Sequence, residues 1–176
     1  MATIVFHELV PVSWFRQRRL MKAILIELFG KERVPVELIE FIFCNDEYLL
    51  KINREFLQHD DLTDIITFDL SNPFPGESFS NHLSGGGRVD IAARKMSPAG
   101  SGPTAVIPKH GEIYISVERV LENAATLGVG RQDELRRVMF HGCLHLCGYK
   151  DKLNEEKVLM RKMEDKYLRL YKLRST

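Results

Sequence analysis

The sequence predicts a single domain of the α/β class, in which four short strands are interspersed with five helices along the chain. A length of 176 residues suits one domain with a hydrophobic core of its own. Apolar residues make up 44% of the chain and charged residues 28%, which is ordinary for a globular protein. Strands and helices are distinguished by hydrophobic patterns that repeat about every two residues and every three to four residues respectively.

Four segments are predicted as strands because they are short, apolar and rich in β-branched or aromatic residues. They are residues 3–7 (TIVFH), 38–44 (LIEFIFC), 64–69 (DIITFD) and 111–116 (GEIYIS). The second of them shows the alternation of a half-buried strand most clearly.

Five segments are predicted as helices because their apolar residues follow helical spacing. They are residues 14–29, 45–57, 117–127, 131–147 and 154–172. Residues that commonly cap helix starts stand before or at three of them, namely Asn45 or Asp46, Ser116 and Asn154. Gly30 and Gly128 stand where helices are predicted to end.

Residues 71–109 differ in composition from the rest of the chain. Of these 39 residues, 17 are Gly, Pro or Ser, so the segment has little apolar surface to bury. It is predicted as an insertion between two strands, without a domain of its own. One interpretation is a lid or substrate-holding arm that carries Arg88, Arg94, Lys95 and Lys109; the preferred one is a disordered insertion.

Charge and cysteine content narrow the class of protein. A net charge of +1 gives no global electrostatic sign of nucleic-acid binding. Three cysteines do not make a disulfide framework, which predicts a cytoplasmic protein. No apolar block is long enough for a signal peptide or a membrane span, so no membrane association is expected.

The strongest functional signal lies in residues 141–151, which read HGCLHLCGYKD. His141 and His145 would lie one turn apart on the same helix face. Gly148 allows the helix to end in a left-handed residue, so that the chain can turn back and bring Asp151 near the histidines. This spacing matches that of metzincin zinc sites, with Asp in place of the third His. It predicts one Zn²⁺ per chain, with a fourth coordination position open for water.

Two plainer interpretations of these residues remain open. His141 and His145 could be ordinary helix histidines, and Asp151 could belong to a solvated turn with the lysines beside it. Gly142 occupies the position at which a zinc protease carries its general-base Glu. The pattern therefore favours metal-activated water but argues against the usual peptidase mechanism.

Cys143 and Cys147 alternate with the histidines but are not predicted to share their metal. They lie about 200° around the helix from His141 and His145 respectively. They are predicted instead as small apolar residues of the core.

Three blocks of sequence are similar to motifs of the YbeY family of metal-dependent endoribonucleases, which mature ribosomal RNA. The first is Asn53 followed by residues 62–68 (LTDIITF), and the second is residues 111–115 (GEIYI). The third and most specific is residues 141–149 (HGCLHLCGY). With the helices between the blocks, the resemblance covers nearly the whole chain outside residues 71–109.

The resemblance implies one domain over residues 1–176, with a small mixed four-stranded sheet, about five helices, and a metal site on a helix and the turn after it. It implies a zinc-dependent endoribonuclease, specific for single strands, that acts in small-subunit ribosomal RNA processing and ribosome quality control in the cytoplasm. The implied partners are ribosomal RNA and the small ribosomal subunit, with a ribosomal protein or an assembly GTPase as a further candidate.

The chain departs from the family pattern at three positions. The third block usually ends in Asp-His, whereas this chain has Lys150 and Asp151, so that a carboxylate replaces the third His ligand. The family's Arg in the first block corresponds to Leu57, and the Asp of the second block is Glu112. Loss of the Arg removes a residue associated with catalysis or phosphate binding.

Other polar residues are therefore considered for the reaction. Arg54 and Lys150 are the candidate catalytic residues besides water on the metal, and Thr63, Asp64 and Lys152 are candidates for substrate binding. Thr63 could equally end a turn, and Asp64 could cap a backbone group.

The C-terminal segment has a local excess of positive charge. Residues 150–176 contain nine Lys or Arg against five Asp or Glu, which would suit the RNA backbone. The preferred interpretation is a solvated amphipathic helix, stabilised by pairs such as Glu164 with nearby Lys and Arg.

Two other functions remain open on the sequence. A metal-dependent hydrolase of amide or small phosphoester bonds is supported by the metzincin-like spacing. A non-catalytic ribosome-assembly factor, in which the metal only stabilises the C-terminal helices, is supported by the loss of the family Arg at Leu57.

Overall fold

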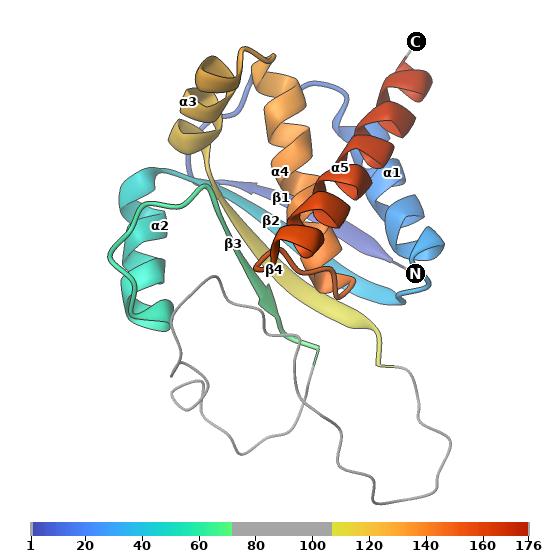
Figure 1. Cartoon of the computed structure of the whole chain (residues 1–176), viewed down its shortest axis with the longest axis horizontal. Coiled ribbons are helices and arrows are strands. Elements are labelled where there is room, and N and C mark those ends of the chain that lie inside the picture. The colour runs from blue at the N-terminus through green and yellow to red at the C-terminus, as the bar shows by residue number, and fades with distance from the viewer. Residues whose placement is uncertain (1, 72–106, 176) are drawn as a thin grey trace, which may run out of the picture.

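Four strands and five helices make up the described part of the chain, residues 2–71 and 107–175 of a computed structural model (Figure 1). The strands are β1 (Thr3–Glu8), β2 (Val36–Cys44), β3 (Ile65–Asp69) and β4 (Lys109–Ser116). The helices are α1 (Arg18–Lys31), α2 (Asp46–Ile52), α3 (Val117–Leu127), α4 (Arg131–Leu146) and α5 (Asn154–Ser175), and a π-helical turn η1 (Asn53–Leu57) continues α2. The predicted α/β fold with a four-stranded sheet is confirmed.

The sheet is mixed, with the strand order β1-β2-β4-β3. β1, β2 and β4 run parallel, and β3 is an antiparallel strand at the edge beside β4. Because side chains alternate along a strand, Ile113 and Ile115 of β4 point to one face and Tyr114 points to the other.

The two faces of the sheet are covered unequally. The larger core lies between one face and helices α1, α4 and α5, with Phe41, Phe43 and Ile113 of the sheet fully buried (Figure 1). On the other face, α2 and η1 cover a smaller cluster around Leu49 and Ile66. α4 is therefore a central helix, packed against the sheet on one side and against α5 on another.

A glycine allows α4 to lie close to the sheet. A Cβ at Gly142 would be 2.9 Å from Cδ1 of Ile65 and 3.0 Å from Cγ2 of Ile113. The face of α4 that carries Gly142 is thus in direct contact with β3 and β4. His141, its neighbour in sequence, lines a cavity together with Asp64, the residue before β3.

Most helix ends follow the predicted caps. The side chain of Asn45 accepts a hydrogen bond from the Tyr48 amide, and Ser116 accepts one from the Arg119 amide. Gly128 ends α3 with φ of 65°, the left-handed conformation that glycine adopts easily. Asn154, predicted as a cap, is instead the first residue of α5.

Two predicted helices differ from the structure. The helix predicted from residue 14 begins only at Arg18, because Gln17 adopts a left-handed φ of 56° that a continuous helix does not allow. Phe15 is nevertheless buried in the core from the preceding loop. The helix predicted over residues 45–57 is divided into α2 and the π turn.

The predicted insertion connects β3 with β4, and its last residue is the first residue of β4. The side chain of Lys109, the first residue of β4, forms an ion pair with Asp69 at the end of β3. The hydroxyl of Ser71 accepts a hydrogen bond from the His110 amide. The remainder, residues 72–106 with Arg88, Arg94 and Lys95, lies outside the described residues. Within the described parts, none of the helices has the length and apolarity needed to cross a membrane.

Candidate metal centre

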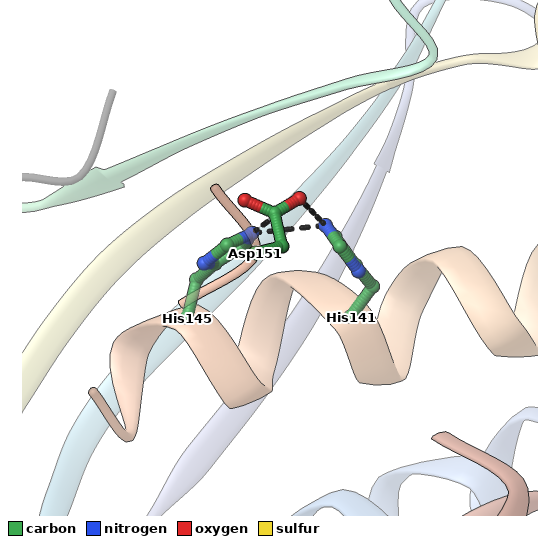
Figure 2. A group of neighbouring side chains, drawn as sticks. All are labelled: His141, His145 and Asp151. Atoms are coloured by element: carbon green, nitrogen blue, oxygen red, sulfur yellow. Dashed lines mark hydrogen bonds and ion pairs between the residues drawn. The ribbon is translucent and has the colours of Figure 1, made fainter. Parts of the chain in front are cut away.

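His141, His145 and Asp151 converge at one end of α4 (Figure 2). The Nε2 atoms of the two histidines are 2.9 Å apart. Oδ2 of Asp151 lies 3.7 Å from Nε2 of His141 and 3.9 Å from Nε2 of His145. The three side chains thus present one nitrogen or oxygen atom each to a common point, with all three atoms within 4.8 Å of one another.

The turn after α4 brings Asp151 to the histidines. Gly148 takes a φ of 93°. Its amide donates to the carbonyl of His145 at 2.9 Å, and the Tyr149 amide donates to the carbonyl of Leu144 at 3.0 Å. These two bonds form a Schellman motif, which ends the helix and reverses the chain. Asp151 follows with only 4% of its surface exposed.

Each histidine is oriented by a hydrogen bond at its other ring nitrogen. Nδ1 of His141 lies 2.7 Å from Oε1 of Glu164, and Nδ1 of His145 lies 3.0 Å from the carbonyl oxygen of Tyr149. Both partners are acceptors, so each Nδ1 carries the hydrogen and each Nε2 keeps its lone pair for the common point. Ligating histidines in metal sites have this arrangement.

Glu164 links the site to a buried ion-pair network between α4 and α5. Its Oε2 accepts a hydrogen bond from Nη1 of Arg137 at 3.2 Å, and Arg137 also donates to Glu134 at 2.5 and 2.9 Å. Burial opposes ionisation of Glu164, but its hydrogen bond with His141 and the positive charge of Arg137 outweigh this and hold its pKa below the usual range. The carboxylate is therefore ionised at neutral pH.

Cys143 of α4 and Cys147, which follows it, do not join the group. Cys143 is fully buried in the main core, as predicted, and burial raises the pKa of its thiol well above the ordinary value. Cys147 is partly buried against the same core, and burial raises its pKa to about 12. Thiols held neutral in this way are poor metal ligands.

The donor set and its spacing fit a small divalent ion. Bond lengths of about 2.0–2.2 Å in a tetrahedral zinc site place neighbouring donor atoms about 3.3 Å apart. The separations of 2.9, 3.7 and 3.9 Å lie on either side of that value. Two imidazoles and one carboxylate are also a ligand set found in catalytic zinc sites, which leave one position open.

A cavity of about 380 Å³ opens beside His141 and Asp151. Its wall is formed by α3, α4, α5 and the residue before β3, and it includes Asp64, Asn123, Thr126, Leu127, Arg137, Val138, Lys157, Met160, Arg161 and Glu164. Of the predicted substrate-binding residues, Asp64 lies on this wall, where its Oδ2 accepts a hydrogen bond from Asn123 at 3.3 Å.

The other candidate residues lie elsewhere. The hydroxyl of Thr63 donates to the carbonyl of Ile65. Arg54 lies on η1 in an exposed ion pair with Asp60. Lys150 and Lys152 flank Asp151 in the turn, and both are exposed. None of these four residues is among those that line the described cavity.

The role of Glu164 is not predicted from the sequence. It was interpreted as part of a solvated face of α5, whereas only 3% of its surface is exposed. A signal was present, because Met160, Met163, Tyr167 and Tyr171 mark the buried face of α5, and position 164 falls within that face.

Comparison with known proteins gives consistent matches. The family described as Endoribonuclease YbeY matches residues 6–172. A protein of Cytophaga hutchinsonii named Endoribonuclease YbeY is 38% identical over 170 residues, which cover 97% of this chain and 96% of that protein. One of the same name from Flavobacterium psychrophilum is 42% identical over 133 residues, covering 76% and 71% respectively.

A solved structure has a similar fold. The solution structure of a Thermotoga maritima protein matches with a TM-score of 0.57 and 24% sequence identity. The match covers 98% of this chain and 93% of that one.

Proposed function

Because this chain belongs to the YbeY endoribonuclease family, we propose that it is a metal-dependent endoribonuclease that cuts single-stranded RNA in the maturation of small-subunit ribosomal RNA. The observation that carries this proposal is the convergence of two oriented imidazoles and one carboxylate at the edge of a cavity. A divalent ion held by such donors would polarise a phosphodiester, and the cavity leaves room for a substrate beside it.

The proposed ligands of the ion are His141, His145 and Asp151. A Zn²⁺ ion bound there, one per chain, supplies Lewis acidity to the phosphodiester and to water. The chain's own residues fix the geometry: Glu164 and the carbonyl of Tyr149 hold the imidazoles so that both Nε2 atoms face the same point. Asp151 would add one negative charge to this ligand set, which a third histidine would not.

The substrate contacts are also proposals. Asp64 lies on the cavity wall, where it can accept a hydrogen bond from water or from a ribose hydroxyl. Lys150 and Lys152 lie next to Asp151 in sequence and can reach phosphates that approach from solvent. Thr63 and Arg54 are kept as more distant candidates, because Thr63 bonds to Ile65 and Arg54 to Asp60.

The proposed partner is the small ribosomal subunit, with its ribosomal RNA as the substrate. A ribosomal protein or an assembly GTPase is a further proposed partner, and the cytoplasm is the proposed compartment. Recruitment by such a partner would add to the affinity for RNA through effective concentration.

Metal content and RNA cleavage test the proposal together. Elemental analysis of the purified protein should find about one zinc per chain, and His145→Ala and Asp151→Ala should each lose it. The wild-type protein should cut precursor small-subunit ribosomal RNA, and a chelator should stop the reaction. Zinc retained in Asp151→Ala would exclude this carboxylate as a ligand, and metal-loaded protein that leaves the precursor uncut would refute the enzymatic proposal.

A further inference from the structure

The cavity beside the candidate metal centre contains three positively charged side chains, and they differ in how they are bound. Arg137 comes from α4, and Lys157 and Arg161 come from α5. Arg137 donates to the carboxylates of Glu134 and Glu164, and these bonds to Glu134 raise its pKa further above the usual range. Arg137 is therefore engaged in ion pairs that join α4 to α5.

Lys157 and Arg161 differ from Arg137 in their contacts. Within residues 2–71 and 107–175, neither side chain makes a hydrogen bond or an ion pair with a carboxylate. Both side chains are exposed. The carboxylates of Asp64 and Asp151 line the same cavity, but neither forms an ion pair with these two cations. Two cations that have no carboxylate partner in the described part of the chain therefore lie beside the candidate metal centre, where an anionic ligand can reach them.

Their positions on α5 suit an extended anion. The two residues are four apart, so they lie one above the other on the same helix face, about 6 Å apart along the helix axis. The next residue of that row one turn on is Glu164, which binds His141. The row therefore leads directly from solvent to the candidate metal centre.

We propose that Lys157 and Arg161 form a phosphate-binding subsite that aligns the backbone of single-stranded RNA beside the metal. This inference rests on the proposed function and specifies how the substrate is held. With a divalent ion bound, the cavity as a whole carries net positive charge, which favours a polyanion.

Most cations of α5 lie outside this subsite and provide a control. Lys162 and Arg169 are exposed on the same helix but do not line the cavity. The double variants Lys157→Ala/Arg161→Ala and Lys162→Ala/Arg169→Ala remove equal charge from α5. A difference between them reports the position of the charge and excludes a general effect of net charge.

The measurement is binding of a short single-stranded RNA to the zinc-loaded protein by fluorescence anisotropy at several salt concentrations, with the RNA checked on a gel for integrity. Each phosphate contact on a single strand contributes about 0.7 to the slope of log affinity against log salt. Loss of two contacts should reduce the slope by about 1.4, and at about 0.1 M salt should weaken binding by roughly 25-fold. The control variant should keep the wild-type slope.

Cleavage kinetics provide a second readout. Contacts made equally in the bound state and the transition state raise KM when they are lost and leave kcat nearly unchanged. Lys157→Ala/Arg161→Ala should therefore show a raised KM with an unchanged thermal midpoint, because both side chains are exposed. The variant Arg161→Lys should bind RNA more tightly than Lys157→Ala/Arg161→Ala, since a point charge still binds phosphate.

The outcomes separate the two proposals. If the wild-type protein binds and cuts RNA but the two double variants lose affinity equally, or neither loses it, the subsite is refuted and the endoribonuclease proposal stands. If the wild-type protein neither binds nor cuts single-stranded RNA, both proposals fail.

Discussion

Removal of the charge of Glu164 should weaken the metal centre without removing a ligand. Glu164→Gln keeps the shape of the side chain, and the amide oxygen can still accept a hydrogen bond from Nδ1 of His141. The present bond, 2.7 Å long, joins the ring to an ionised carboxylate. Charge-assisted bonds are about twice as strong as neutral ones, so the neutral amide holds the ring less firmly and makes Nε2 less basic.

The magnitude follows from the behaviour of such outer partners. Their loss typically lowers metal affinity by about 10–100-fold, which corresponds to about 1.4–2.8 kcal/mol. The loss of metal affinity in Glu164→Gln should be near the lower limit of this range. Glu164→Ala should approach the upper one, because it also removes a partner of Arg137, which keeps only Glu134.

The assay is competition for zinc between the protein and a chromophoric chelator at neutral pH. Asp165→Asn is the matched control, because it removes the same charge from the next position of α5, where the side chain is exposed. Its affinity should equal that of the wild-type protein. If Glu164→Gln binds zinc within about twofold of wild type, the hydrogen bond does not tune the site and the reasoning is wrong.

Three further predictions concern the stability of the whole domain. Chelation of zinc should lower the thermal midpoint by at most about 5–10 °C, the shift expected for an ion at about 100 times its Kd, as measured by differential scanning fluorimetry. Gly142→Leu should destabilise the fold by about 1–3 kcal/mol in urea unfolding, because its side chain would collide with Ile65 and Ile113; an unchanged midpoint would show that α4 can move off the sheet. Glu32→Gln should lower the free energy of unfolding by about 1–2 kcal/mol at neutral pH, because the Glu32 carboxylate accepts hydrogen bonds, one of them from the Tyr149 hydroxyl. Burial raises the pKa of Glu32, but these bonds outweigh burial and hold it below the usual value. The stabilisation is therefore present at neutral pH and lost as the pH falls through the lowered pKa, so urea titrations of both proteins should converge in acid.

Local signals in the sequence were sufficient for most of the fold. Ser116 and Gly128 mark the ends of α3 because capping depends on one residue and its immediate neighbours. Gly148 predicted the reversal after α4 for the same reason. The boundary at Arg18 could not be predicted in this way, because Phe15 continues the apolar spacing although the chain before Arg18 is not helical.

The site was predictable only where its residues are close in sequence. His141, His145 and Asp151 lie on one helix and the turn after it, so their spacing alone indicated that they converge. Glu164 and Asp64 reach the same cavity through the packing of α5 and the start of β3 against α4. That packing depends on the tertiary core, which a local pattern does not contain. The same limit applies to Lys157 and Arg161, which the sequence showed only as part of a basic segment.

The proximity of the three candidate ligands along the chain has a consequence for folding. All of them lie within residues 141–151, so an ion can be bound by one helical turn and a chain reversal before the sheet has formed. The partly unfolded chain would then compete with the native state for the ion. Because an ion stabilises the native state only by its preference over the unfolded chain, its affinity overstates its contribution to stability. In a newly synthesised chain, such an ion could nucleate the C-terminal half of α4.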